Sequence, residues 1–230
     1  MDYARIQRAA RDLQVEIWRS RDLLTQSRQL TPIEILQPDY AAFVLGLDYQ
    51  EVPSLGEPRF GSKGKQFRAA GLISFADERI LVSSEFAETV MRFTAGHELG
   101  HWMLHHGRVE TMHRDLPIDG SVVPKTLIER EANYFSACFL MPERLLQEYF
   151  NAQFGVKGQF IFNEASSFQL SPGDPDSLHY ASSESLDREL ALARCTRFNG
   201  RYMNSLAQQF GVSDSAMARR IKELKLIRWP

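Results

Sequence analysis

The sequence predicts an α+β protein that is mainly helical, with one small antiparallel sheet and a helix-turn-helix module near its C-terminal end. Apolar residues recur at helical spacing over much of the 230 residues. Two short apolar runs, 70–75 and 79–82, flank a polar stretch that fits a hairpin turn. Residues 205–221 have small, turn-forming and apolar side chains at the spacing of two short helices joined by a tight turn.

The elements follow one another in a clear order. Residues 4–29 carry apolar side chains at helical spacing, which predicts an amphipathic helix or a helix pair. Residues 40–52 predict a second helix followed by a short strand. After the hairpin, a long helix should begin at a Ser83-Ser84 cap and end near His106. Two further helices are expected, at 125–140 and 143–150.

These elements suggest four parts. We expect an N-terminal helical arm at 1–35 and a main domain at 36–150. Residues 151–184 contain several Ser, Pro and Gly residues and little periodicity, so we expect a linker or a mobile insertion there. Residues 185–230 form the predicted helix-turn-helix module.

Composition and charge exclude several classes of protein. The chain is 43% hydrophobic and 24% charged, with a formal net charge of −2, so it is not a polycation that binds nucleic acid with its whole surface. It has no apolar run near the ~18 residues of a membrane helix, and its first residues do not resemble a secretory signal. We therefore expect a cytoplasmic protein with no membrane partner, in which Cys138 and Cys195 are free thiols.

The sharpest motif is His97-Glu98-Leu99-Gly100-His101. On a helix, residues four apart share a face, so both imidazoles can bind one metal ion. Glu98 lies about 100° round the helix, where its carboxylate can take a proton from an activated water molecule. The alternative is a pair of surface histidines. Three more histidines, His105, His106 and His113, are expected to be solvated or to lie behind the ligands.

A catalytic zinc site needs three protein ligands and one open position, so a third ligand must come from elsewhere. The helix at 125–140 offers Glu129 and Glu131. Glu131 lies in the middle of the apolar stripe of that helix, whereas Glu129 lies on the opposite face. A carboxylate buried on an apolar face is costly unless it binds a metal or is paired. We therefore predict Glu131 as the ligand; the alternative for Glu131 is a salt bridge to a buried arginine such as Arg92.

Two stretches carry a resemblance to a known family. Residues 92–105 contain the H-E-x-x-H motif, and residues 129–142 read E-R-E-A-N-Y-F-S-A-C-F-L-M-P. In this order they resemble the ImmA/IrrE-type metallopeptidases. The resemblance implies a zincin-like fold with a small sheet on the active-site helix, His97, His101 and Glu131 as zinc ligands, and Glu98 as catalytic base. Members of this family often cleave a helix-turn-helix repressor and thereby switch on stress or mobile-element genes.

Other features of the expected mechanism stay open. The oxyanion donor is one of His113, Tyr134 and Tyr202. Either strand-like run, 71–75 or 79–82, presents an edge that pairs with an extended substrate, or the two strands only support the helix. Because His and carboxylate ligands discriminate weakly among metals, Mn²⁺ or Fe²⁺ can replace Zn²⁺.

The C-terminal module has a local excess of positive charge. Between residues 197 and 228 there are seven Lys or Arg residues and two acidic residues, which gives a local net charge of +5. Arg219, Arg220 and Lys222 are the candidate contacts to nucleic acid. The alternative is that this module packs against the core or docks the substrate.

Three functions follow from these patterns. The first is an intracellular zinc endopeptidase whose partner is a protein substrate, expected to be a co-encoded repressor. The second is a transcription regulator of the same fold that cuts nothing and binds DNA or a partner through the C-terminal module. The third is a small-molecule hydrolase. The complete set of predicted ligands with Glu98 favours the first, and the sequence does not determine the oligomeric state.

Overall fold

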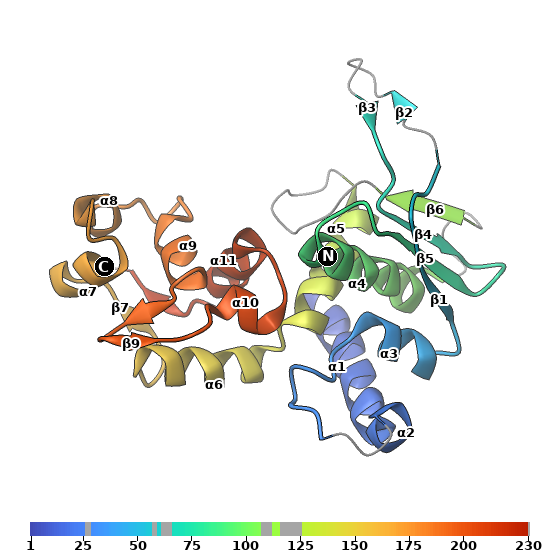
Figure 1. Cartoon of the computed structure of the whole chain (residues 1–230), viewed down its shortest axis with the longest axis horizontal. Coiled ribbons are helices and arrows are strands. Elements are labelled where there is room, and N and C mark those ends of the chain that lie inside the picture. Colours follow the sequence, from blue (N-terminus) through green and yellow to red (C-terminus); the bar gives the residue numbers. More distant parts are fainter. Residues whose placement is uncertain (26–28, 57–58, 61–65, 107–111, 116–125, 230) are drawn as a thin grey trace. The chain divides into compact units, whose positions relative to one another are not determined.

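The computed structural model describes residues 1–25, 29–56, 59–60, 66–106, 112–115 and 126–229. The chain divides into two compact units, Met1–Leu140 and Met141–Pro230 (Figure 1). Helices and small sheets occur in both units, which agrees with the predicted α+β class. None of the helices within the described ranges has the length and hydropathy needed to cross a membrane.

The first unit contains a four-stranded sheet and, within its described residues, these elements: α1 (Tyr3–Arg19), α2 (Arg21–Thr25), α3 (Pro38–Val44), β1 (Asp48–Val52), β2 (Arg59–Phe60), β3 (Gln66–Phe67), β4 (Gly71–Ser74), β5 (Arg79–Ser83), α4 (Glu88–His105), β6 (Met112–Asp115) and α5 (Leu127–Leu140). The strand order in the sheet is β1-β5-β4-β6, and β2 and β3 form a separate antiparallel pair.

The predicted hairpin is present, but the sheet is larger than expected. Strands β4 and β5 are antiparallel, with Ile73 opposite Ile80. Strand β1 pairs in parallel with β5, so the sheet is mixed and the prediction of a purely antiparallel sheet is wrong. Both β4 and β5 lie inside the sheet. Their backbone groups are already paired, so neither strand offers the substrate-binding edge considered above, and their role is to support α4.

Helix α4 lies between the sheet and α5 (Figure 1). It begins at Glu88, with Ala87 as its N-cap, rather than at the predicted Ser83-Ser84 cap. Ser83 is the last residue of β5, and its backbone N–H donates to the carbonyl of Ala70 at 2.8 Å. Ser83 is therefore part of the sheet and does not cap α4 as the sequence predicted. Because α4 is covered on two sides, most of its residues from Phe93 onward are buried.

Small residues allow α4 and α5 to cross closely. A Cβ atom at Gly100 would lie 2.9 Å from the carbonyl oxygen of Ala132, and one at Gly96 would lie 2.5 Å from Ser136 Oγ. Ser136 Oγ also donates a hydrogen bond to the Phe93 carbonyl at 2.9 Å. A larger residue at any of these positions would separate the two helices.

Helix α1 packs on α5 and belongs to the first unit, so the prediction of a separate arm at 1–35 is wrong. Gln14 Nε2 donates to the carbonyls of Cys138 and Phe139 at 2.9 and 3.0 Å. The rings of Tyr3 and Tyr134 meet edge to face, with 4.9 Å between their centroids. Four apolar residues of α1 are buried at helical spacing: Ile6, Ala10, Leu13 and Ile17.

The second unit is built from short elements: α6 (Glu143–Phe154), β7 (Phe160–Ile161), α7 (Glu164–Leu170), α8 (Pro175–His179), α9 (Asp187–Ala193), β8 (Arg197–Phe198), β9 (Arg201–Tyr202), α10 (Leu206–Phe210), α11 (Asp214–Glu223) and β10 (Ile227–Arg228). Strand β10 pairs in parallel with β7, and β8 pairs with β9 in antiparallel fashion.

Residues 151–184 are an integral part of this second unit, so the prediction of a linker or mobile insertion is wrong. The segment includes β7, α7 and α8. The side chain of Asn163 caps α7 and that of Asp174 caps α8. Helices of five to seven residues are too short to show clear periodicity, which is why the sequence pattern missed them. The units separate after Leu140, so α6 lies in the second unit and the predicted boundary at 150 is also wrong.

Helices α10 and α11 form at the residues where the sequence predicts two helices and a turn. Gly211 ends α10 in the left-handed region, at φ 61°, and Ser213 Oγ accepts a hydrogen bond from the backbone N–H of Ala216 at 3.1 Å. Met217 and Ile221 are fully buried, as predicted for the inward face of α11.

The close crossing of α4 and α5 makes Gly100 sensitive to substitution. We expect Gly100→Ala to destabilise the protein by about 1–3 kcal/mol, because the new methyl group overlaps backbone atoms of Ala132. Gly173→Ala is the control, since a Cβ there meets nothing within 4 Å and the backbone is not left-handed. Denaturant unfolding measures both effects, and equal stability of the two variants would contradict the account of the crossing.

Candidate metal centre

Three donor side chains of the first unit converge on one point. His97 Nε2 lies 2.9 Å from His101 Nε2. The Glu129 carboxylate reaches both rings, with Oε2 at 3.2 Å from His97 Nε2 and Oε1 at 3.6 Å from His101 Nε2. In the described part of the chain, these three residues form the cluster of potential metal ligands, with one donor atom from each and all three atoms within 4.8 Å of one another.

The two helices position these groups in different ways. His97 and His101 are one turn apart on the same face of α4, and both are fully buried. Glu129 lies in the first turn of α5 and keeps 21% of its side chain exposed. The centre therefore has a rigid, buried side made by α4 and a side at α5 that solvent can reach.

The donor set fits a divalent cation. Two imidazoles and one carboxylate are the ligands of many catalytic zinc sites, and ligands about 2.0–2.1 Å from a tetrahedral ion lie roughly 3.3–3.4 Å from one another. The three observed separations, 2.9, 3.2 and 3.6 Å, bracket that value. With Nε2 of both histidines unprotonated, their lone pairs and those of the Glu129 carboxylate would face one another at these distances, an arrangement that a cation stabilises.

A hydrogen bond holds the ring of His97. Its Nδ1 lies 2.7 Å from Oδ1 of Asn133, which is on the same helix as Glu129. An amide oxygen can only accept, so the contact places the His97 proton on Nδ1 and leaves Nε2 unprotonated, as binding of a cation requires. Asn133 is part of the E-A-N sequence noted above and thus has a direct role in orienting one predicted ligand.

The ring of His101 is held by a different group. His101 Nδ1 lies 3.2 Å from His105 Nδ1, and His105 Nε2 lies 3.1 Å from Glu131 Oε2. His105 is only 2% exposed, and burial lowers its pKa more than the neighbouring Glu131 carboxylate raises it. The position of His105 behind a ligand agrees with one of the two alternatives stated for it.

The structure does not bring Glu131 to the two ligand histidines, so the prediction of Glu131 over Glu129 is wrong. The Glu131 carboxylate contacts His105, and Arg5 NH2 lies 3.9 Å from it. The alternative partner Arg92 is also wrong, because that side chain bonds to the carbonyl of Leu36 and to Gln37.

The error in the helical argument has a physical cause. The apolar stripe around Glu131 includes Leu127 and Ile128, which are 52% and 38% exposed and so do not mark a core-facing side of α5. The face that contains Glu131 packs toward α1, where Tyr134 accepts a hydrogen bond from Gln7 at 2.8 Å. The face toward α4 is polar and small, and its members are Glu129, Ala132, Asn133 and Ser136. Ala132 and Ser136 are four residues apart, as are Gly96 and Gly100 of α4. This matching spacing of small residues could have shown that the face with Glu129 packs on α4.

Glu98 is fully buried between α4 and the sheet. A Cβ atom at Gly71 of β4 would overlap the Glu98 carboxylate oxygen Oε1. The absence of a side chain at Gly71 therefore creates the space that this carboxyl occupies. Glu98 follows His97 directly on α4, which keeps it beside the centre while it lies outside the triad of donors.

The candidate oxyanion donors receive little support. His113 pairs with Ile73 through its backbone in β6, but its side chain lies outside the described residues. The hydroxyl of Tyr134 is bonded to Gln7 on the α1 side of α5. Tyr202 is 78% exposed in the second unit.

The three predicted nucleic-acid contacts lie in different environments. Arg220 is 2% exposed; its Nε donates to the Met141 carbonyl at 3.1 Å and its NH1 to Glu223 Oε2 at 2.9 Å. Lys222 is half-buried and donates to the Ser185 carbonyl at 2.7 Å. Arg220 therefore supports the fold, and its prediction as a phosphate contact is wrong. Arg219 is half-buried.

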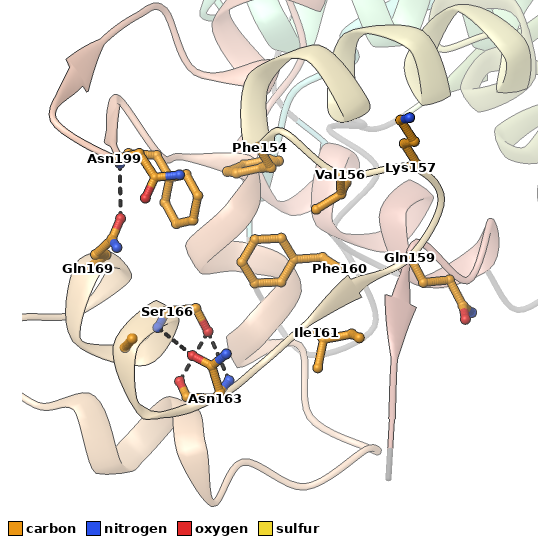
Figure 2. A pocket seen from close by; sticks show the side chains of 12 residues that line it. Phe154, Val156, Lys157, Gln159, Phe160, Ile161, Asn163, Ser166, Gln169 and Asn199 are labelled. Atoms are coloured by element: carbon orange, nitrogen blue, oxygen red, sulfur yellow. Dashed lines mark hydrogen bonds between the residues drawn. The ribbon is translucent and has the colours of Figure 1, made fainter.

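A pocket of about 420 Å³ in the second unit offers different chemistry. Figure 2 shows Phe154 and Phe160 on one side of it and Asn163, Ser166 and Gln169 on another. Gln169 Oε1 accepts a hydrogen bond from the backbone N–H of Asn199 at 2.9 Å. Lys157 is the one titratable residue in its lining, so the pocket lacks an acid–base pair or a set of metal ligands.

Comparison with known proteins places the centre inside a family domain. Residues 59–172 match the model of the Peptidase_M78 family, described as the IrrE N-terminal-like domain. No match to a curated protein was found. The matched range includes His97, Glu98, His101 and Glu129, whereas α1 lies outside it.

Removal of Glu129 tests the donor set. We expect the wild-type protein to bind one Zn²⁺ per chain and Glu129→Ala to lose stoichiometric binding, because one of three ligands is gone. Glu131→Gln tests the other candidate ligand on the same helix and should keep stoichiometric zinc binding, since its amide oxygen can still accept from His105. Zinc titration by calorimetry measures both. Loss of zinc in the Glu131 variant and retention in the Glu129 variant would contradict the assignment.

Arg220 should act on stability. We expect Arg220→Ala to lower the free energy of unfolding by about 2–3 kcal/mol, because it leaves the Met141 carbonyl without its donor and removes a charged hydrogen bond. Arg201→Ala, at an exposed position of β9, should change stability by less than about 0.5 kcal/mol. Equal effects in chemical denaturation would show that the buried contacts of Arg220 are unimportant.

Proposed function

Because residues 59–172 belong to the ImmA/IrrE family of peptidases, we propose that this chain is a metal-dependent endopeptidase that cleaves a helix-turn-helix transcriptional repressor. The observation that carries the proposal is the convergence of His97, His101 and Glu129 within the family domain. Their donor set is that of a catalytic metal site with a position left for water. The presence of Glu98 beside this set supports hydrolysis over simple metal storage.

The chain's own residues would divide the work of hydrolysis. A divalent cation bound by His97, His101 and Glu129 would supply Lewis acidity that activates water and polarises the peptide carbonyl. Glu98 would take a proton from the attacking water and pass it to the leaving nitrogen. Asn133 would keep His97 in the tautomer that binds through Nε2, from its contact at 2.7 Å.

The nature of the metal is part of the proposal. We propose Zn²⁺ because two imidazoles and a carboxylate are a common catalytic zinc set. The same nitrogen and oxygen donors also accept Mn²⁺ or Fe²⁺. Metal analysis of the purified protein, followed by reconstitution of the metal-free form with each ion, separates these choices.

The proposed substrate rests on the resemblance of the two sequence motifs to the ImmA/IrrE peptidases, members of which often act on repressors. A repressor encoded beside this gene is the first substrate to test. The expected location in the cytoplasm, based on the sequence, is compatible with such a target. A small-molecule hydrolase would use the same centre but would leave the repressor intact.

The alternative of a non-catalytic transcription regulator draws less support from the described residues. That reading needs the C-terminal helices to bind DNA or a partner, and it gives Glu98 no task. Of the three predicted phosphate contacts, Arg220 is buried and Lys222 is bonded to a backbone carbonyl. A docking role for α10 and α11 in substrate recognition remains compatible with these contacts.

Glu98→Gln tests the catalytic role. We expect the variant to bind zinc as the wild type does and to cleave the repressor on the order of 10²–10⁴-fold more slowly, because an amide cannot accept the proton from water. Mass spectrometry of the reaction identifies the products and the bond that is cut. As a control, His106→Gln changes an exposed side chain at the end of α4 and should cleave normally. Cleavage by Glu98→Gln at the wild-type rate would show that the mechanism is wrong.

A further inference from the structure

A row of side chains connects the N-terminal helix to the candidate metal centre. We propose that His105 and Glu131 are positioning residues for the metal ligand His101, and that Arg5 of α1 holds the outer end of this row. The inference rests on the proposed function in one respect, namely that His101 binds a metal ion. It assigns a role to three residues that lie outside the donor triad.

Each side chain of the row contacts the next, from the metal centre outward to α1. His101 Nδ1 meets His105 Nδ1 at 3.2 Å, and His105 Nε2 meets Glu131 Oε2 at 3.1 Å. Arg5 NH2 lies 3.9 Å from the same oxygen. The row begins on α4, passes through α5 and ends on α1, so it joins the three helices that pack together around the centre.

The positions of the protons follow from these contacts. An imidazole that binds a cation through Nε2 carries its proton on Nδ1, which requires an acceptor. The atom facing Nδ1 of His101 is Nδ1 of His105, so His105 must accept there and carry its own proton on Nε2. That proton points at the Glu131 carboxylate, which can only accept. The carboxylate therefore fixes the tautomers of both histidines.

Burial makes the row difficult to replace by water. His101 is fully buried and His105 is 2% exposed, so a lost hydrogen bond between them has no solvent substitute. Exposure rises outward, to 12% of the side chain at Glu131 and 42% at Arg5. The Arg5 contact is long and partly solvated, so it should contribute least.

Helix α1 lies outside the residues that match the peptidase family, yet it packs firmly on α5. Gln7 donates to the Tyr134 hydroxyl and Gln14 donates to the backbone of α5. These bonds hold Arg5 beside Glu131. The N-terminal helix thus lies against the outer end of this row, at the Glu131 carboxylate.

The test is a set of variants in the full-length chain, measured by Zn²⁺ affinity in competition with a chromophoric chelator. His105→Leu removes both hydrogen bonds, and we expect it to weaken zinc binding by about 10–100-fold. His105→Asn restores an acceptor near Nδ1 and should recover most of the affinity. His106→Leu is the matched control, because His106 is exposed and next in sequence. Circular dichroism and thermal unfolding of the metal-free proteins show whether each variant is folded.

A double-mutant cycle distinguishes positioning from general packing. Glu131→Ala should weaken zinc binding by about tenfold, and the pair with His105→Leu should bind no more weakly than His105→Leu alone, since both changes break the same row. The ¹⁵N shifts of His101 in the zinc-loaded wild type should show a proton on Nδ1 and metal at Nε2. In zinc-loaded His105→Leu the Nδ1 shift of His101 should move, because its proton has lost its acceptor.

The outcomes are separable. Unchanged zinc affinity and ¹⁵N shifts in a folded His105→Leu variant would overturn the inference while the peptidase proposal stands, as would fully additive losses in the cycle. Equal weakening by His105→Asn and His105→Leu would also overturn it, because the acceptor would then be irrelevant. If the wild type binds no zinc and Glu129→Ala behaves identically, the proposed metal centre itself fails and the inference fails with it.

Discussion

The close approach of α4 to α5 is the constraint on which the centre depends. It is possible because glycine stands at positions 96 and 100, opposite Ser136 and Ala132. At this short separation, a glutamate in the first turn of α5 reaches two imidazoles one turn apart on α4. With larger residues in the contact, the carboxylate would move away from the rings. Packing and chemistry are therefore fixed by the same few positions.

The sequence was sufficient to predict the features that arise between residues close together in the chain. The pair His97 and His101, the β4–β5 hairpin and the Ser213 cap all follow from spacing or from local hydrogen bonding. The resemblance to the peptidase family was also confirmed. In each case the residues that carry the signal are close together in the chain, so a periodicity of 3.6 or 2 is enough to relate them.

The features that failed depend on which neighbour covers a face. Helical spacing shows that Glu129 and Glu131 lie on different faces of α5, but it does not show that α1 covers one face and α4 the other. The exposed Leu127 and Ile128 added a false apolar signal beside Glu131. The same difficulty affects the basic segment near the C-terminus, where a count of charges cannot reveal that Arg220 bonds to Met141 and Glu223.

The centre is also more than its three donors. Asn133 of α5 holds one imidazole, and His105 of α4, itself bonded to Glu131 of α5, holds the other. The most direct test of the whole account is the crystal structure of the zinc-loaded protein with anomalous diffraction at the zinc edge. We predict one zinc ion about 2.0–2.2 Å from His97 Nε2, His101 Nε2 and a Glu129 oxygen. A zinc ion bound through Glu131, or at a position away from the two histidines, would contradict it.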